Sequence, residues 1–149
     1  MLRLFFVSLC LFCLFIPVGC KDPNEGRSNL SGTITIEGVP IENGTIVFQP
    51  LNPDPNIGVT GAQVQIVDGK YSITGGLGLL AGDYKVLIQS QRMVDKKTGQ
   101  TIVGDKPDDP FSFTTENLIP EKYNTNSEIV FTVEDKKGPK TFDFDVKTE

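Results

Sequence analysis

The side chains that most often perform catalysis are largely missing from this chain. Its 149 residues include no histidine, which excludes an imidazole general base, a Ser–His or Cys–His nucleophile pair and a histidine metal ligand. Acidic residues outnumber basic ones by 19 to 14, for a net charge of −5. A chain with this balance has no basic surface for nucleic acid phosphates. We therefore predict no enzymatic activity, no catalytic residues, no cofactor and no nucleic acid partner.

Carboxylates are the remaining candidates for metal or acid–base chemistry. Oxygen side chains gather at residues 52–56 and again at Asp105, Asp108 and Asp109, as a calcium site would require. Neither group has the glycine that a calcium-binding loop needs at its sixth position, so both predict solvated turns and no metal site. Asp143 and Asp145 alternate near the C-terminus, a spacing that predicts outward charge protecting a sheet edge rather than a catalytic pair.

Three aromatic residues are the candidate binding patch. Phe111 and Phe113 lie in a long segment of irregular spacing, and Tyr123 follows shortly after it. Aromatic side chains are enriched where proteins bind partners, and they can also stack on sugars. The structural alternative is that Phe111 and Phe113 begin a strand or fill one end of the core.

The N-terminal segment has the pattern of a signal peptide. Arg3 is the only charged residue among residues 2–18, and the apolar run 4–16 is short of the roughly 20 residues of a membrane-spanning helix. Cys10 and Cys13 lie inside this segment, and no cysteine follows Cys20. We predict a signal peptide over residues 1–19 and no disulfide in the mature chain.

The residues Pro17-Val18-Gly19-Cys20 resemble the lipobox of bacterial lipoproteins, in which a small residue precedes an acylated cysteine. The resemblance implies that Cys20 is the lipid attachment site, that residues 20–29 form a tether, and that the membrane is a partner. It also implies a lipid-anchored protein of the cell envelope, at the outer membrane or periplasmic face. Pro17 stands where that pattern prefers leucine, and secretion without lipid or an uncleaved anchor are the alternatives.

The mature chain shows the period-two alternation of apolar residues that is typical of strands with one buried face. No apolar stripe of helical spacing is long enough for an ordinary helix. Asn-Gly and Asp-Gly pairs between the runs supply the backbone conformation that tight hairpins need. The sequence therefore predicts an all-β domain over residues 30–149, a seven-stranded antiparallel β-sandwich with a long insertion loop at 92–117. The seven alternating runs centre on residues 34–36, 46–48, 64–66, 71–73, 84–88, 129–133 and 142–146.

Several ordered phrases of this domain resemble the carboxypeptidase-regulatory-like, or transthyretin-like (prealbumin-like), β-sandwich. They are residues 30–48, 68–73 and 81–86. Residues 118–124 are similar to a phrase in small lipoproteins of planctomycete bacteria that carry this domain. The resemblance implies a fold and a location, and it brings no activity with it.

These observations together predict a non-catalytic, membrane-anchored envelope lipoprotein whose β-sandwich is a structural or ligand-binding module. Its expected partners are the membrane, through acylated Cys20, and an envelope protein or glycan. The alternative is an accessory subunit of a larger envelope complex for secretion, uptake or polysaccharide handling. In that case the insertion at 92–117 would be the docking element.

Overall fold

A computed structural model of the chain describes residues 26–53, 61–134 and 138–148. The predicted signal peptide, Cys20 and most of the predicted tether lie outside the described residues, as does part of the 52–56 group.

Eleven strands and two short 3-10 turns, η1 and η2, make up the regular structure of the described residues, and none of these residues is in an α-helix. This confirms the prediction of an all-β fold. The strands are β1 (Leu30–Ile36), β2 (Val39–Pro40), β3 (Asn43–Pro50), β4 (Ala62–Val67), β5 (Lys70–Ile73), β6 (Gly82–Gln89), β7 (Gln91–Asp95), β8 (Phe113–Asn117), β9 (Val130–Val133), β10 (Lys140–Thr141) and β11 (Phe144–Val146), and the turns are η1 (Gly75–Leu77) and η2 (Glu121–Tyr123).

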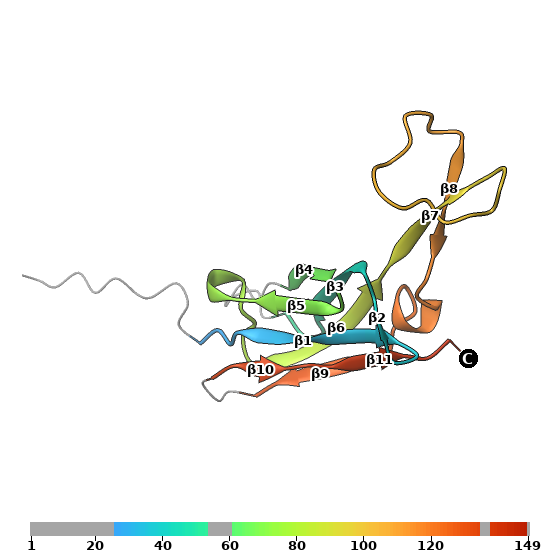
Figure 1. The fold of residues 1–149 in the computed structure, drawn as a ribbon. Coiled ribbons are helices and arrows are strands. Elements are labelled where there is room, and N and C mark those ends of the chain that lie inside the picture. The colour runs from blue at the N-terminus through green and yellow to red at the C-terminus, as the bar shows by residue number, and fades with distance from the viewer. Residues whose placement is uncertain (1–25, 54–60, 135–137, 149) are drawn as a thin grey trace, which may run out of the picture.

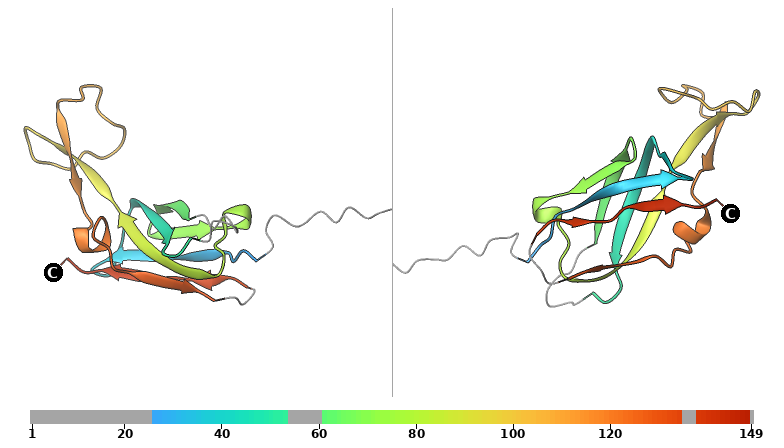
Figure 2. Two further views of the ribbon diagram at one scale, coloured as in Figure 1. Left: turned by 180° about the vertical axis from the view of Figure 1, so that it is seen from behind. Right: turned by 60° about the horizontal axis from the view of Figure 1, so that its bottom comes forward.

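A single curled sheet forms the body of the molecule (Figures 1 and 2). Its strand order is β10-β1-β5-β4-β3-β6-β9, and β2 and β11 also pair with β1. Each of the seven predicted alternating runs contributes a strand to this sheet. The curl brings two parts of the same apolar face together in a sandwich-like arrangement, because the sheet must bury that face against itself.

The expectation of a purely antiparallel sandwich was wrong at one place. β1 pairs in parallel with both β10 and β11, while the other strand pairs of the sheet are antiparallel. Alternation along a strand tells which face is buried and carries no information on the strand's partner. The first and last strands of the domain therefore lie side by side, a pairing that the sequence pattern could not reveal.

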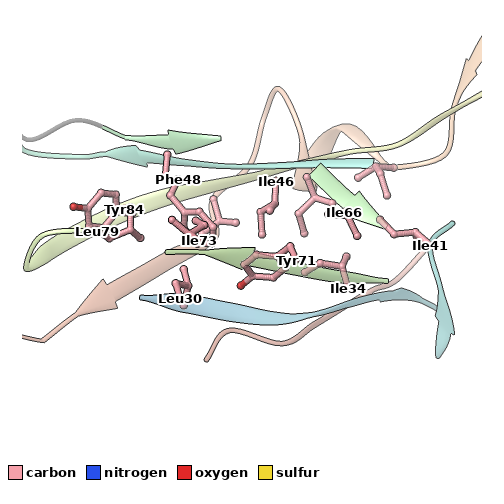
Figure 3. Close-up of a cluster of buried hydrophobic side chains, with 14 of the residues drawn as sticks. Leu30, Ile34, Ile41, Ile46, Phe48, Ile66, Tyr71, Ile73, Leu79 and Tyr84 are labelled. Carbon is pink, nitrogen blue, oxygen red and sulfur yellow. The ribbon is translucent and has the colours of Figure 1, made fainter. Parts of the chain in front are cut away.

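The core is built from the inward residues of the alternating strands (Figure 3). Ile46, Phe48 and Ile88 are fully buried, and they come from the adjacent strands β3 and β6. The rings of Phe131 on β9 and Phe142 beside β11 lie 5.2 Å apart, and each lies 6.0 Å from Phe48. Aromatic contacts thus close the gap between the two end strands of the curled sheet.

The parallel pairing beside β1 is supported by hydrogen bonds to the Phe142 carbonyl and the Asp143 carboxylate, between β10 and β11. The Tyr71 hydroxyl donates to the Phe142 carbonyl at 2.8 Å, and the Thr33 N–H donates to Asp143 Oδ1 at 2.7 Å. Burial, aided by the negative charge of Asp143, raises the pKa of Tyr71 far above its usual value, so its hydroxyl remains a donor. Gly32 allows this close approach, because a Cβ there would lie 1.9 Å from the Phe142 oxygen.

Asp143 and Asp145 lie on the C-terminal segment at the end of the sheet, where both bond to β1; their expected role in protecting a sheet edge stays a prediction. Asp145 Oδ1 accepts hydrogen bonds from the Thr35 hydroxyl at 2.6 Å and the Gly38 N–H at 2.8 Å, and Lys147 donates to Oδ2 at 2.6 Å. Both carboxylates therefore join the last strand of the domain to the first, on the side of β11 that pairs with β1.

The sandwich has two distinct ends. The chain enters β1 at one end, where Ser28 forms a β-bridge with Leu79. The end of β1, the start of β3 and the end of β6 meet at the other, where the Ile41 N–H donates to the Ile34 carbonyl and Ser90 Oγ to the Asn43 carbonyl. We call these the tether end and the distal end. β7 and β8 project from the distal end (Figures 1 and 2).

Candidate functional site

The predicted insertion loop is a projecting β-ribbon, which corrects the expectation for residues 92–117. β7 continues β6 after Ser90 and pairs antiparallel with β8, from Gln91↔Asn117 at the base to Asp95↔Phe113 at the far end. Only the residues between these two strands form a loop, which we call the tip. Ser90 is buried and fixes the base, since its hydroxyl donates to the Asn43 carbonyl and its carbonyl accepts from the Leu118 N–H.

Hydrogen bonds give the tip a defined shape. The Asp95 N–H donates to the Gln100 carbonyl at 2.9 Å, and the Ile102 N–H donates to the Met93 carbonyl at 2.8 Å. Asp95 Oδ1 accepts from the backbone and hydroxyl of Thr98 and from the Lys97 N–H, and these bonds lower the pKa of Asp95. The tip segment 100–102 therefore folds back along β7, where Thr101 forms an isolated β-bridge with Val94.

Two large apolar side chains are displayed on the tip. Val103 is 91% exposed and Phe111 is 81% exposed. The Phe111 N–H donates to Asp109 Oδ1 at 2.9 Å, so the Asp109 side chain holds the turn that carries this ring. Exposed aromatic rings on a protruding element are typical of surfaces that bind another molecule.

The three predicted patch residues do not lie together. Phe113 begins β8 at the far end of the ribbon, where Lys106 Nζ lies 5.7 Å from its ring centre. Tyr123 lies in η2, beyond the base of the ribbon, and its ring packs 5.4 Å from that of Phe144. The four steps from Phe113 to Asn117 along β8 span about 13 Å. Phe111 and Phe113 are therefore ribbon residues, and Tyr123 belongs to the edge of the core.

A groove lies at the base of the ribbon, and the sequence analysis did not predict it. It has a volume of about 400 Å³. Residues from the β1–β2–β3 turns form one wall, and residues from the ribbon and from Leu118 after β8 form the other. No sequence signal pointed to it, because its walls are far apart in the chain. The lining residues are Ile36, Val39, Pro40, Ile41, Glu42, Asn43, Ser90, Gln91, Arg92, Thr101 and Leu118.

The described residues contain neither a metal-binding cluster nor a membrane-spanning helix. Within the described ranges, no group of three or more acidic or cysteine side chains is placed to hold a metal ion. The helices of the same ranges include none long and apolar enough to cross a membrane. Cys20, the predicted lipid attachment site, lies outside those ranges.

Comparison with known proteins does not identify the chain. The sequence matches no protein-family model, and it matches no curated protein. The crystal structure of a 9R-lipoxygenase from Cyanothece PCC8801 is similar over 84% of this chain and 17% of its own, with 10% identity and a TM-score of 0.30. The chain thus spans less than a fifth of that protein's length. A similarity at this level carries no argument, so the candidate site rests on the ribbon and the groove alone.

Proposed function

We propose that this protein is a non-catalytic binding module of the bacterial cell envelope, anchored to a membrane through acylated Cys20 after removal of residues 1–19. The transthyretin-like identity of its β-sandwich is part of the same proposal. The observation that carries it is the β7–β8 ribbon, which projects beyond the core with Phe111 and Val103 exposed.

The positions of the two ends support a binding role facing away from the membrane. β1 starts at the tether end and its seven residues run toward the distal end, a length of about 23 Å. The ribbon adds its own length beyond that point (Figure 2). An anchor at Cys20 would hold the tether end near the lipid, so the ribbon and its groove would face outward.

The exposed ribbon residues favour a second candidate function, an accessory subunit of a larger envelope complex. Hot spots of protein interfaces are enriched in aromatic side chains that enter a pocket of the partner. Phe111 is presented in that way by the Asp109 turn. In this case the ribbon would be the docking element for a protein, and the lipid would position it.

The test is mild-detergent co-purification of the full chain from its own envelope, compared between three variants. Phe111→Ser with Val103→Ser removes the apolar tip, and Leu77→Ser at the tether end, 71% exposed, is the matched control. A stoichiometric protein that is lost only with the tip variant supports the accessory subunit. Cys20→Ser should release the protein from membranes, and its persistence in the detergent phase would contradict the lipid anchor.

Point variants are preferable to deletion of the tip. Removing residues 100–109 would take away the Gln100 and Ile102 contacts to β7 and the Asp109 turn. A deletion would therefore change the shape of the ribbon as well as its surface. The serine variants leave all of these backbone contacts in place.

A further inference from the structure

The outward face of the sheet at the distal end carries uncharged amide side chains in register. Thr45 on β3 lies between Gln65 on β4 and Gln89 on β6, because it pairs directly with both. Gln91 continues the alternation of Gln89 past the buried Ser90. Strands lie about 4.8 Å apart, so these side chains form a row about 10 Å wide across three strands.

A second hollow lies over this row. It has a volume of about 270 Å³ and is lined by Asn43, Gly44, Thr45, Gln65, Gln89, Ser90 and Gln91. Asn43, Ser90 and Gln91 also line the groove at the base of the ribbon. The two hollows therefore adjoin, and we call the second hollow the amide trough. None of the described residues that line the second hollow is charged.

Neighbouring polar groups orient the amides without using up their hydrogen-bonding capacity. Gln89 Nε2 donates to Asn124 Oδ1 at 3.4 Å, and the Thr45 hydroxyl donates to Gln65 Oε1 at 3.5 Å. Both distances are at the long end for a hydrogen bond. A glutamine side chain offers two donors and an oxygen with two lone pairs. A ligand could therefore replace these weak contacts with shorter ones.

We infer that the amide trough binds an uncharged saccharide, with Gln65, Gln89 and Gln91 hydrogen-bonding its hydroxyl groups. A hydroxyl both donates and accepts, as does an amide, so the two match without any net charge. The adjoining groove adds apolar surface from Ile36, Val39 and Leu118, against which the C–H faces of a sugar ring can pack. This inference rests on the proposed function, because it names the ligand of the envelope module.

The backbone at the trough favours a saccharide over an extended peptide. Peptides that bind sheets commonly add a strand to an open edge and use its backbone N–H and carbonyl groups. β3 runs through the middle of the trough and is paired on both sides, with β4 and with β6. At Thr45 no strand edge is open, and the side chains of the row that face a ligand are neutral amides and a hydroxyl.

The test measures binding of neutral oligosaccharides to the purified full chain in detergent. The probes are cellohexaose, laminarihexaose and mannohexaose, with hexagalacturonic acid as the charged comparison, and the readout is isothermal titration calorimetry. Gln65→Ala with Gln89→Ala removes two amides from the trough. The matched control is Gln49→Ala, an exposed amide on the same face of β3 that does not line either hollow.

We expect at least one neutral hexasaccharide to bind, and the double variant to bind it at least about tenfold more weakly, since two hydrogen bonds to neutral groups are lost. Gln49→Ala should bind as the wild type does. Raising salt from about 0.1 M to about 1 M should leave the affinity unchanged, because screening does not act on a neutral ligand.

Three results would overturn the inference: no neutral saccharide binds, the charged hexamer alone binds, or Gln49→Ala weakens binding as much as the double variant. If no saccharide binds, the proposal of a membrane-anchored envelope module is unaffected, because release of the Cys20→Ser variant from membranes is measured separately. Conversely, saccharide binding by a protein that is not membrane-anchored would overturn only the proposed location.

Discussion

Gly32 is the position where a single added methyl group should do the greatest damage to the fold. It lies on β1 beside residues 142–143, which connect β10 to β11. Both of these strands pair in parallel with β1. A Cβ at Gly32 would lie 1.9 Å from the Phe142 oxygen, 2.7 Å from its carbonyl carbon and 2.9 Å from the Tyr71 hydroxyl. Backbone atoms cannot rotate away as a flexible side chain can, so Gly32→Ala must push the C-terminal strand off β1.

The size of the loss follows from the contacts that Phe142 makes there. Its N–H donates to the Ser31 carbonyl at 3.0 Å, and its carbonyl accepts from Tyr71. Two such bonds contribute about 1 kcal/mol each, and the displaced aromatic pair with Phe131 about another 1 kcal/mol. Replacing glycine by alanine within a strand otherwise stabilises the fold by about 0.5–1 kcal/mol. The strain of the displaced backbone cancels this gain. We expect Gly32→Ala to lower the free energy of unfolding by about 3 kcal/mol.

Urea unfolding of the full chain, followed by circular dichroism because the chain has no tryptophan, measures this change. Tyr71→Phe is the control, since it removes only the hydroxyl and should cost about 1–2 kcal/mol. The double variant should cost less than the sum of the two single changes, because both act on the Phe142 carbonyl. A Gly32→Ala protein as stable as the wild type would refute the close approach of β1 and residues 142–143.

Two further predictions concern the core and the carboxylates. Phe48→Ala should lower the free energy of unfolding by about 3–5 kcal/mol, because Phe48 is fully buried and its ring contacts three others; a smaller loss in urea unfolding would mean that the core collapses around the cavity. Hydrogen bonds from Lys147, Thr35 and Gly38 lower the pKa of Asp145 from 3.8 to about 2, so its ionised form stabilises the fold above about pH 4 and this contribution disappears as the pH falls toward 2. In urea titrations across this range, Asp145→Asn should be less stable than wild type at neutral pH, and the difference should shrink on acidification; a constant difference would show that ionisation plays no part.

Seven of the nine strands of the main sheet could be predicted because each carries its own alternation, whereas β2 and β10 have two residues each and are too short to show one. Ile46 and Phe48 on β3, or Val86 and Ile88 on β6, alternate with polar residues, and all four are buried. β7 and β8 were not predicted because they bury little apolar surface: Val94 on β7 is the one buried residue of the two strands, which are joined by pairing with each other. β8 reads Phe-Thr-Thr-Glu-Asn and has no fully buried side chain. Its period was therefore not visible in the sequence.

The candidate site was less predictable for a different physical reason. Phe111, Phe113 and Tyr123 were grouped because they are close in the sequence and aromatic, but β8 separates the first two from Tyr123. The amide trough depends on register between strands, which places Gln65, Thr45 and Gln89 in one row. A glutamine at an outward position has the same local pattern whether it faces bulk water or lines a hollow, so only the folded sheet distinguishes the two.

The arrangement of the sheet separates the residues that hold the fold from those that face a ligand. The fold is held where β1 meets the C-terminal strands. Gly32 allows the close approach of Phe142 there, and the rings of Phe48 and Phe142 pack against each other. Gln65 and Gln89 are exposed at the distal end and make only long hydrogen bonds. Substitutions of the two amides should therefore change binding with a stability change of no more than about 0.5 kcal/mol, as for surface positions in general. Their effect on saccharide affinity can then be assigned to the trough itself, because the closure that sets the strand register is untouched.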